Sequence, residues 1–142
     1  MNIINKTYEM KDKKVILSTL WIFVTLNYIY CDVFTLTNPE DLKQIISGTG
    51  GSISMTQGFL LGAAILMEIP IAMIILSRVL KFKANRLANI IAGSIMTLVQ
   101  IMSLFIGTGP TLHYVFFSII EISCTSFIVW YTWTWPKSEE NY

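Results

Sequence analysis

Four long apolar runs constrain this chain more than any motif in it. They cover about residues 15–37, 55–76, 87–107 and 111–133, and each has the roughly 17–25 residues that a helix needs to cross a bilayer. A membrane-spanning strand needs only about 9–11 residues. Because lipid offers no partner for unpaired backbone groups, runs of this length must be helical. The sequence therefore predicts an all-α fold, a bundle of four transmembrane helices.

The composition agrees with a membrane protein. Of the 142 residues, 54% are hydrophobic and 13% are charged, against about 25% charged in soluble proteins. The apolar runs leave no room for a separate soluble domain, so we expect one membrane domain over residues 1–142. The net charge of +1 gives no support to nucleic-acid binding. The first run is too long for a signal-peptide core and no cleavage site follows it, so we expect a retained helix.

The basic residues predict the orientation of the bundle. Nine of the ten Lys and Arg residues precede the first run, lie in the turn at 77–86 or fall in the C-terminal tail, and only Lys43 lies on the other side. Cytoplasmic loops of membrane proteins carry an excess of Lys and Arg. We therefore expect a multi-pass protein of the cell membrane, with both termini in the cytoplasm.

The connection between the first two runs has the pattern of a short external helix. Asn38 suits the N-cap, Pro39 suits the first helical position, and Gly48 suits the end. Apolar residues at positions 42, 45 and 46 would lie on one face, as in a helix on a membrane surface or capping the bundle. The Gly- and Ser-rich stretch 47–52 is predicted to be a flexible link.

Each predicted helix carries a strong hydrogen-bonding side chain near its centre. These are Asn27, Glu68, Gln100 and Glu121, with Asp32 nearer the outside. A central Asp costs roughly 2.5–3.5 kcal/mol on insertion scales, so such residues face a protein interior, have a partner or carry function. For the two amides we favour hydrogen bonds between helices. For the two glutamates we favour a function, because an ionisable group is a poorer choice for holding helices together.

Helical spacing predicts an inward polar stripe. Tyr28 and Asp32 are one turn apart. One face of the fourth run carries Tyr114, Ser118, Glu121, Thr125 and Thr132. The third run repeats this pattern with polar or small residues at positions 89, 93, 97 and 100. We expect Glu68 and Glu121 to face one shared cavity, with at least one protonated near neutral pH. The candidate ligand- or proton-binding residues are Glu68, Glu121, Asp32, Asn27, Gln100 and Tyr28.

Pro70 lies two positions after Glu68 and cannot donate to the carbonyl of Leu66. The free carbonyl and the carboxylate would suit a cation, a proton or a ligand donor. Bent helices without such a role are also common in membranes, and both interpretations stay open. Gly58 and Gly62 form a Gly-x-x-x-Gly pair that would either close the bundle or dimerise it.

The chain carries no recognisable catalytic constellation. Its two cysteines lie on different predicted helices, and His113 is the only histidine. This excludes Cys-x-x-Cys redox chemistry and ligation of haem by two histidines of one chain. No spacing of His, Cys and carboxylates suggests zinc. We expect no cofactor, no metal site and no catalytic residues of a known type.

Four segments of the chain form recognisable motifs: Leu26-Asn-Tyr-Ile-Tyr-Cys-Asp32, Leu66-Met-Glu-Ile-Pro-Ile71, Ser77-Arg-Val-Leu-Lys81 and Asn85-Arg-Leu-Ala-Asn89. With these segments the chain resembles an uncharacterised family of small four-helix bacterial and archaeal membrane proteins. The resemblance covers almost the entire chain and implies no known activity. The pattern of spans is also similar to that of DoxX-like four-helix proteins.

Three hypotheses for function follow from the polar midplane. The first is binding or transport of a small cationic or amphipathic molecule, coupled to protons through Glu68 and Glu121. The second is an accessory or structural membrane subunit whose polar residues hold partner helices. The third is an intramembrane lipid-modifying or isomerase-like enzyme. The expected partner is the lipid bilayer, and the candidate partners are a small-molecule or lipid ligand and a second copy of the chain.

Overall fold

A computed structural model describes residues 3–50, 53–105 and 110–135. Within them lie five α-helices, which are α1 (Ile3–Thr37), α2 (Pro39–Ile46), α3 (Gln57–Val79), α4 (Phe82–Ser103) and α5 (Leu112–Trp133). A short antiparallel pair, β1 (Thr49–Gly50) and β2 (Ile53–Ser54), follows α2. By length and composition α1, α3, α4 and α5 can each cross a membrane. The predicted all-α fold with four such helices and a short helix after the first is confirmed.

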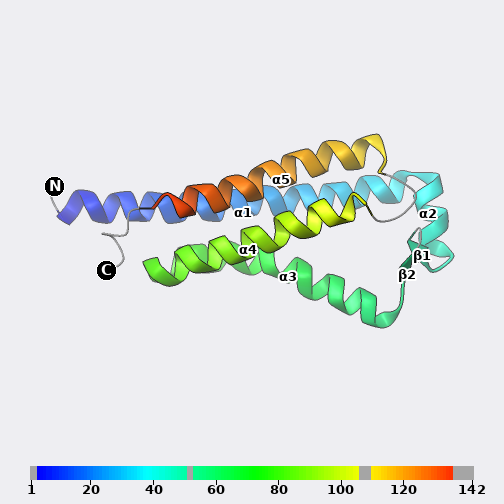
Figure 1. Ribbon diagram of the computed structural model, residues 1–142, viewed down its shortest axis with the longest axis horizontal. Coiled ribbons are helices and arrows are strands. Elements are labelled where there is room, and N and C mark those ends of the chain that lie inside the picture. The colour runs from blue at the N-terminus through cyan, green and yellow to red at the C-terminus, as the bar shows by residue number, and fades with distance from the viewer. Residues whose placement is uncertain (1–2, 51–52, 106–109, 136–142) are drawn as a thin grey trace.

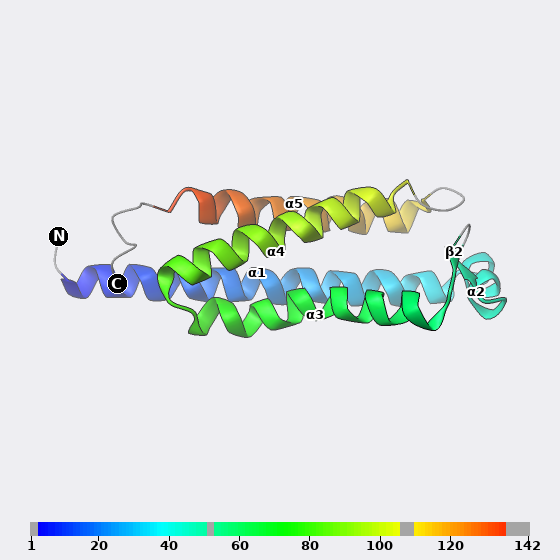
Figure 2. The ribbon, with the colours of Figure 1, turned by 60° about the horizontal axis from the view of Figure 1, so that its bottom comes forward.

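The four long helices lie roughly along one axis and alternate in direction (Figures 1 and 2). We call the end formed by the start of α1, the α3–α4 turn and the end of α5 the basic end. The opposite end carries α2, β1 and β2, and we call it the α2 end. α3 packs along α1 and α4 packs along α5. From their turn at the basic end, α3 and α4 diverge toward the α2 end (Figures 1 and 2).

Two helices begin earlier than the apolar runs predict. α1 has 35 residues and a length of about 52 Å at about 1.5 Å per residue, which exceeds the roughly 30 Å of bilayer hydrocarbon. α4 begins at Phe82 rather than at residue 87, and the ring of Phe82 stacks on Trp135 with 4.7 Å between centroids. This contact anchors the first turn of α4, so only Leu80 and Lys81 lie between α3 and α4. The turn predicted at residues 77–86 is therefore longer than the turn in the structure. Residue 107, the predicted end of the third apolar run, lies outside the described residues.

The short helix α2 has the predicted ends. The side chain of Asn38 accepts a hydrogen bond from the Glu40 amide at 3.2 Å, and Gly48 adopts a φ of 79°. Leu42 and Ile46 are exposed and Ile45 is half-buried, so the bundle covers only part of its apolar face. The stretch after α2 differs from the predicted flexible link, because Thr49–Gly50 and Ile53–Ser54 pair as strands.

Basic residues at the basic end bind backbone carbonyls at the ends of helices. The ammonium of Lys14 donates to the carbonyl of Leu80 at 2.7 Å, and the guanidinium of Arg86 donates to that of Trp133 at 3.2 Å. The last carbonyls of a helix have no partner within it and carry partial negative charge. The basic residues therefore also stabilise the C-terminal ends of α3 and α5.

A fully buried hydrogen-bond network joins α1, α3 and α4 near the basic end. The side-chain oxygen of Asn89 accepts from the Trp21 indole at 2.7 Å and from the Ser77 hydroxyl at 3.2 Å. Its amide donates to both oxygens of Asn85, and the Asn85 amide donates to the Ser77 carbonyl at 2.6 Å. We call these four residues, Trp21, Ser77, Asn85 and Asn89, the Asn89 network. All four are 0% exposed, and a satisfied network of this kind fixes the positions of the three helices.

The contact between α4 and α5 is close and polar. A Cβ atom on Gly93 would lie 2.7 Å from a methyl group of Val129 and 3.3 Å from the Thr125 carbonyl, so only glycine permits this approach. Nearby, the Thr97 hydroxyl donates to that of Thr125 at 2.7 Å. The polar faces predicted for the third and fourth runs therefore meet each other.

Candidate functional site

Glu121 lies near the middle of α5, in the part of the bundle where α5 packs on α1 and α4. Its side chain is 1% exposed, and neither carboxyl oxygen has a hydrogen-bond partner among the described residues. A buried polar group without a partner is costly, and an ionised one costs far more. Glu121 is therefore the polar group of the bundle whose burial most needs an explanation.

Tyr28 of α1 is a second buried group of this kind. It is 5% exposed, its hydroxyl has no partner among the described residues, and it interacts electrostatically with Glu121. Cys31, Asp32 and Tyr114 also interact electrostatically with Glu121. We call these five residues the Glu121 cluster. It joins α1 to α5 and contains no basic side chain.

The Glu121 cluster runs from the interior to the surface. Asp32 lies one turn after Tyr28 on α1, and its side chain is exposed. Tyr114 lies about two turns before Glu121 on α5, and its hydroxyl donates to that of Ser103 at 2.7 Å. The cluster therefore offers one buried and one exposed acid on the same side of α1 and α5.

This arrangement favours binding of positive charge. A carboxyl group in low dielectric is stable when neutral, or when a cation compensates its charge. The Tyr28 hydroxyl has no hydrogen-bond partner among the described residues. It can therefore donate a hydrogen bond to an oxygen of a neighbouring residue or accept one from a bound ligand. Because the cluster has two carboxyl groups and no Lys or Arg, a proton or a cation could compensate their charge.

The two predicted amides make local or interhelical hydrogen bonds. Asn27 is half-buried, and its amide donates to the Phe23 carbonyl of its own helix at 2.9 Å. Gln100 is buried, and its amide donates to the Ser118 hydroxyl of α5 at 2.8 Å. Neither contact reaches the oxygens of Glu121.

Glu68 does not join the Glu121 cluster. Its side chain is exposed, whereas Pro70, two positions later, is buried against the bundle. The prediction that Glu68 and Glu121 face one shared cavity is therefore wrong for this chain on its own. A turn of α3 is about 3.6 residues, so a side chain two positions from a buried one points to the opposite face.

The surface of α3 before Glu68 is also open. Residues 56–65 are all exposed, and a Cβ atom on Gly62 would meet no atom within 4 Å. The Gly58–Gly62 pair thus does not close the bundle within one chain.

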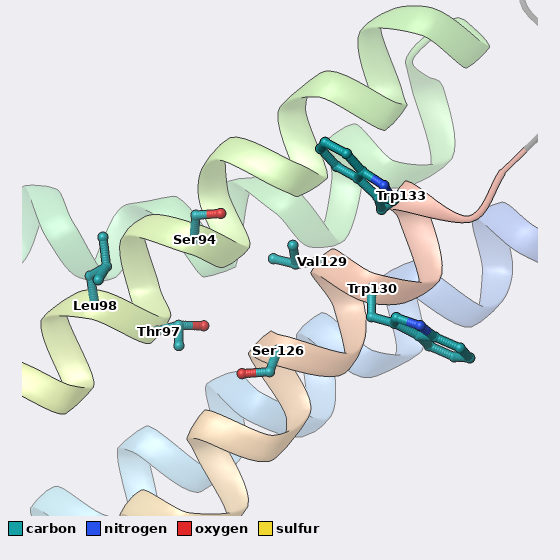
Figure 3. Close-up of a pocket in the computed structure, with 7 residues that line it drawn as sticks. All are labelled: Ser94, Thr97, Leu98, Ser126, Val129, Trp130 and Trp133. Atoms are coloured by element: carbon teal, nitrogen blue, oxygen red, sulfur yellow. The ribbon is translucent and has the colours of Figure 1, made fainter. Parts of the chain in front are cut away.

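Two of the hollows on the described surface are lined by residues other than Glu121. One, of about 370 Å³, lies beside α2 and is lined by Glu40, Lys43, Gln44 and Ser47. The other, of about 450 Å³, lies between α4 and α5 (Figure 3). Two indoles and three hydroxyls line it together with two aliphatic side chains: Trp130, Trp133, Ser94, Thr97, Ser126, Leu98 and Val129. These shallow hollows differ from the enclosed sites that bury most of a ligand, so we place the candidate site at Glu121.

Two members of the cluster were not among the predicted site residues. Cys31 precedes Asp32, and Tyr114 shares a helical face with Ser118 and Glu121. The predicted polar face of the fourth run thus already contained Tyr114, although Tyr114 was not among the predicted site residues. The described residues contain no group of three or more His, Cys, Asp or Glu side chains that could hold a metal ion.

A comparison with protein families gives a match over nearly the whole chain. Residues 4–141 match DUF6326, a family of unknown function. The chain belongs to this family. The match extends over all five helices, including Asp32, Glu68 and Glu121. No curated protein and no solved structure matches the chain. The predicted resemblance to an uncharacterised family is thus confirmed, and function must be argued from the residues themselves.

Proposed function

We propose that this DUF6326 protein spans the cell membrane and binds or transports a small cationic or amphipathic molecule, exchanging it for a proton at Glu121. The observation that carries the proposal is the carboxyl group of Glu121, which is 1% exposed and has no hydrogen-bond partner on either oxygen among the described residues. An ionisable residue inside a membrane usually serves an ion, a proton or a substrate.

The exchange follows from competition for one group. A proton neutralises Glu121, and a bound cation requires its ionised form, so one carboxyl cannot hold both. Asp32 is exposed and interacts electrostatically with Glu121. It therefore supplies a second, exposed acid near the buried one. Binding of the cation should release a proton, and a fall in pH should displace the cation.

Binding of tetraphenylphosphonium, a small lipophilic cation, to the protein in nanodiscs tests the proposal. Affinity of the wild type should rise as pH increases. Glu121→Gln should remove this pH dependence and weaken binding at least about tenfold, which is about 1.4 kcal/mol. Glu9→Gln is the matched control, because Glu9 is exposed near the start of α1. It makes the same chemical change and should leave binding unaltered.

Equal binding by wild type and Glu121→Gln at every pH would refute the role of Glu121. Loss of binding in Glu9→Gln as well would show that the probe responds to overall charge rather than to the buried site.

The proposed orientation places both termini and the α3–α4 turn in the cytoplasm. All described basic side chains except Lys43 lie at that end of the bundle, which is the pattern that the positive-inside rule gives for a cytoplasmic end. Single cysteines at Ser47, beside α2, and at Ala84, in the first turn of α4, test it after Cys31 and Cys124 are replaced. An impermeant thiol reagent added to intact cells should label position 47 alone. Labelling of position 84 alone would show that the protein has the opposite orientation.

A second candidate function, an accessory membrane subunit, is favoured by one observation. Glu68 lies on an exposed face of α3, away from its own bundle. A carboxyl group on such a face is suited to hold a partner helix.

A further inference from the structure

The face of α3 that points away from the bundle has a regular composition. The buried residues of α3 are Pro70, Met73 and Ser77. On the opposite face lies a row of residues spaced alternately four and three apart, which we call the α3 seam: Leu61, Ile65, Glu68, Ala72, Ile75 and Val79.

Every residue of the α3 seam is exposed. The exposed fractions of its largest apolar side chains are 63% for Leu61, 62% for Ile65, 63% for Ile75 and 72% for Val79. Alternating steps of four and three are the spacing with which one helix packs along another in a coiled coil. The seam therefore has the geometry of a helix–helix contact that one copy of the chain leaves unfilled.

Glu68 distinguishes the α3 seam from an ordinary lipid-facing surface. It occupies the centre of the 23-residue helix. It makes no hydrogen bond or ion pair with another described residue. In a membrane-spanning α3 the carboxyl group would meet hydrocarbon at the greatest depth. The four large apolar residues of the seam need no partner there, whereas Glu68 does.

A second copy of the chain supplies the partner that fits Glu68. Two copies inserted in the same direction and related by a two-fold axis place each seam residue opposite its own counterpart. Glu68 lies at the helix centre, so the two carboxyl groups would meet at one depth. A carboxyl pair sharing a proton has both a donor and acceptors, and is therefore complementary to itself.

We propose that α3 forms the interface of a homodimer in which the Glu68 carboxyl groups of the two copies hydrogen-bond to each other. The flanking apolar residues of the α3 seam pack above and below this contact. The proposal stands independently of the function proposed for Glu121, which lies in the interior of one copy.

Disulfide cross-linking in membranes tests the interface. In a background in which Cys31 and Cys124 are replaced, Ala72→Cys places a thiol on the seam, one turn after Glu68. Ser126→Cys is the matched control, because Ser126 is exposed on α5 at nearly the same distance from the start of its helix. Oxidation should cross-link Ala72→Cys to a dimer and leave Ser126→Cys monomeric.

Substitution of Glu68 in the Ala72→Cys protein tests the carboxyl contact itself. Glu68→Ala should lower the cross-linking yield about five- to thirtyfold, the range for polar pairs between model membrane helices. Glu68→Gln should retain most of the yield, since an amide also donates and accepts. Glu68→Lys should abolish it through repulsion, and co-expression with wild-type Glu68 should restore cross-linked mixed dimers.

Three results would overturn the homodimer. They are absence of cross-linking at position 72, equal cross-linking at positions 72 and 126, and an unchanged yield in Glu68→Ala. Capture of a different membrane protein at position 72 in place of a second copy would also overturn it, and would favour the accessory-subunit function. Glu68→Gln is the control for misfolding, because a correctly folded protein with this substitution is expected to keep most of its cross-linking yield.

Discussion

Asn89→Leu is expected to lower the free energy of unfolding by about 2–4 kcal/mol, since it leaves several buried groups unpaired at about 1–3 kcal/mol each. Asn89 accepts hydrogen bonds from Trp21 and Ser77 and donates to Asn85. Leucine is of similar size but can make none of these contacts. Reversible unfolding in mixed micelles, followed by tryptophan fluorescence, measures the change.

Asn27→Leu is the control for this substitution. Asn27 is half-buried, and its amide donates only to the Phe23 carbonyl of its own helix. The same change of residue type should therefore alter stability by less than about 0.6 kcal/mol, the average for polar contacts in a membrane protein. Equal effects of the two substitutions would mean that the Asn89 network does not hold the three helices together.

Glu121→Met is expected to have the opposite effect on stability, raising the free energy of unfolding by about 1–3 kcal/mol. Methionine fills a similar volume without the cost of burying two carboxyl oxygens that have no hydrogen-bond partner in the described part of the chain. The same variant should lose all pH-dependent binding of tetraphenylphosphonium. A residue retained for function at the expense of stability gives this combination of results.

The comparison of Glu121→Met with Asn89→Leu is informative because both replace a buried polar residue by an apolar one. Asn89 is fully hydrogen-bonded and Glu121 is not. A loss of stability in Glu121→Met similar to that in Asn89→Leu would show that Glu121 holds the helices together. Unaltered cation binding in Glu121→Met would exclude it as the binding group.

Local patterns were sufficient to predict much of the fold. Four apolar runs of membrane-spanning length became α1, α3, α4 and α5. The cap at Asn38 and the turn at Gly48 follow from side-chain and backbone chemistry within a few residues. The buried polar face of α5 followed from the helical spacing of Ser118, Glu121 and Thr125, all of which are buried.

The direction of Glu68 could not be predicted in the same way. Helical spacing tells which residues share a face, but α3 is apolar around most of its circumference. Only the neighbouring helices decide which face is covered, and they cover the side of Pro70 and Met73. The early start of α4 likewise depends on Trp135, more than fifty residues after Phe82 in the sequence. Contacts between distant parts of the chain set both features.

Whether Glu121 exchanges a proton for a bound cation is best measured as proton release. Tetraphenylphosphonium is added to the purified protein in weakly buffered detergent solution near neutral pH, and a pH indicator records the protons released. Wild type and Glu9→Gln should release protons in proportion to the probe bound, and Glu121→Gln should release none. Binding without proton release in wild type, or unchanged release in Glu121→Gln, would contradict the assignment of Glu121 as the exchanging group.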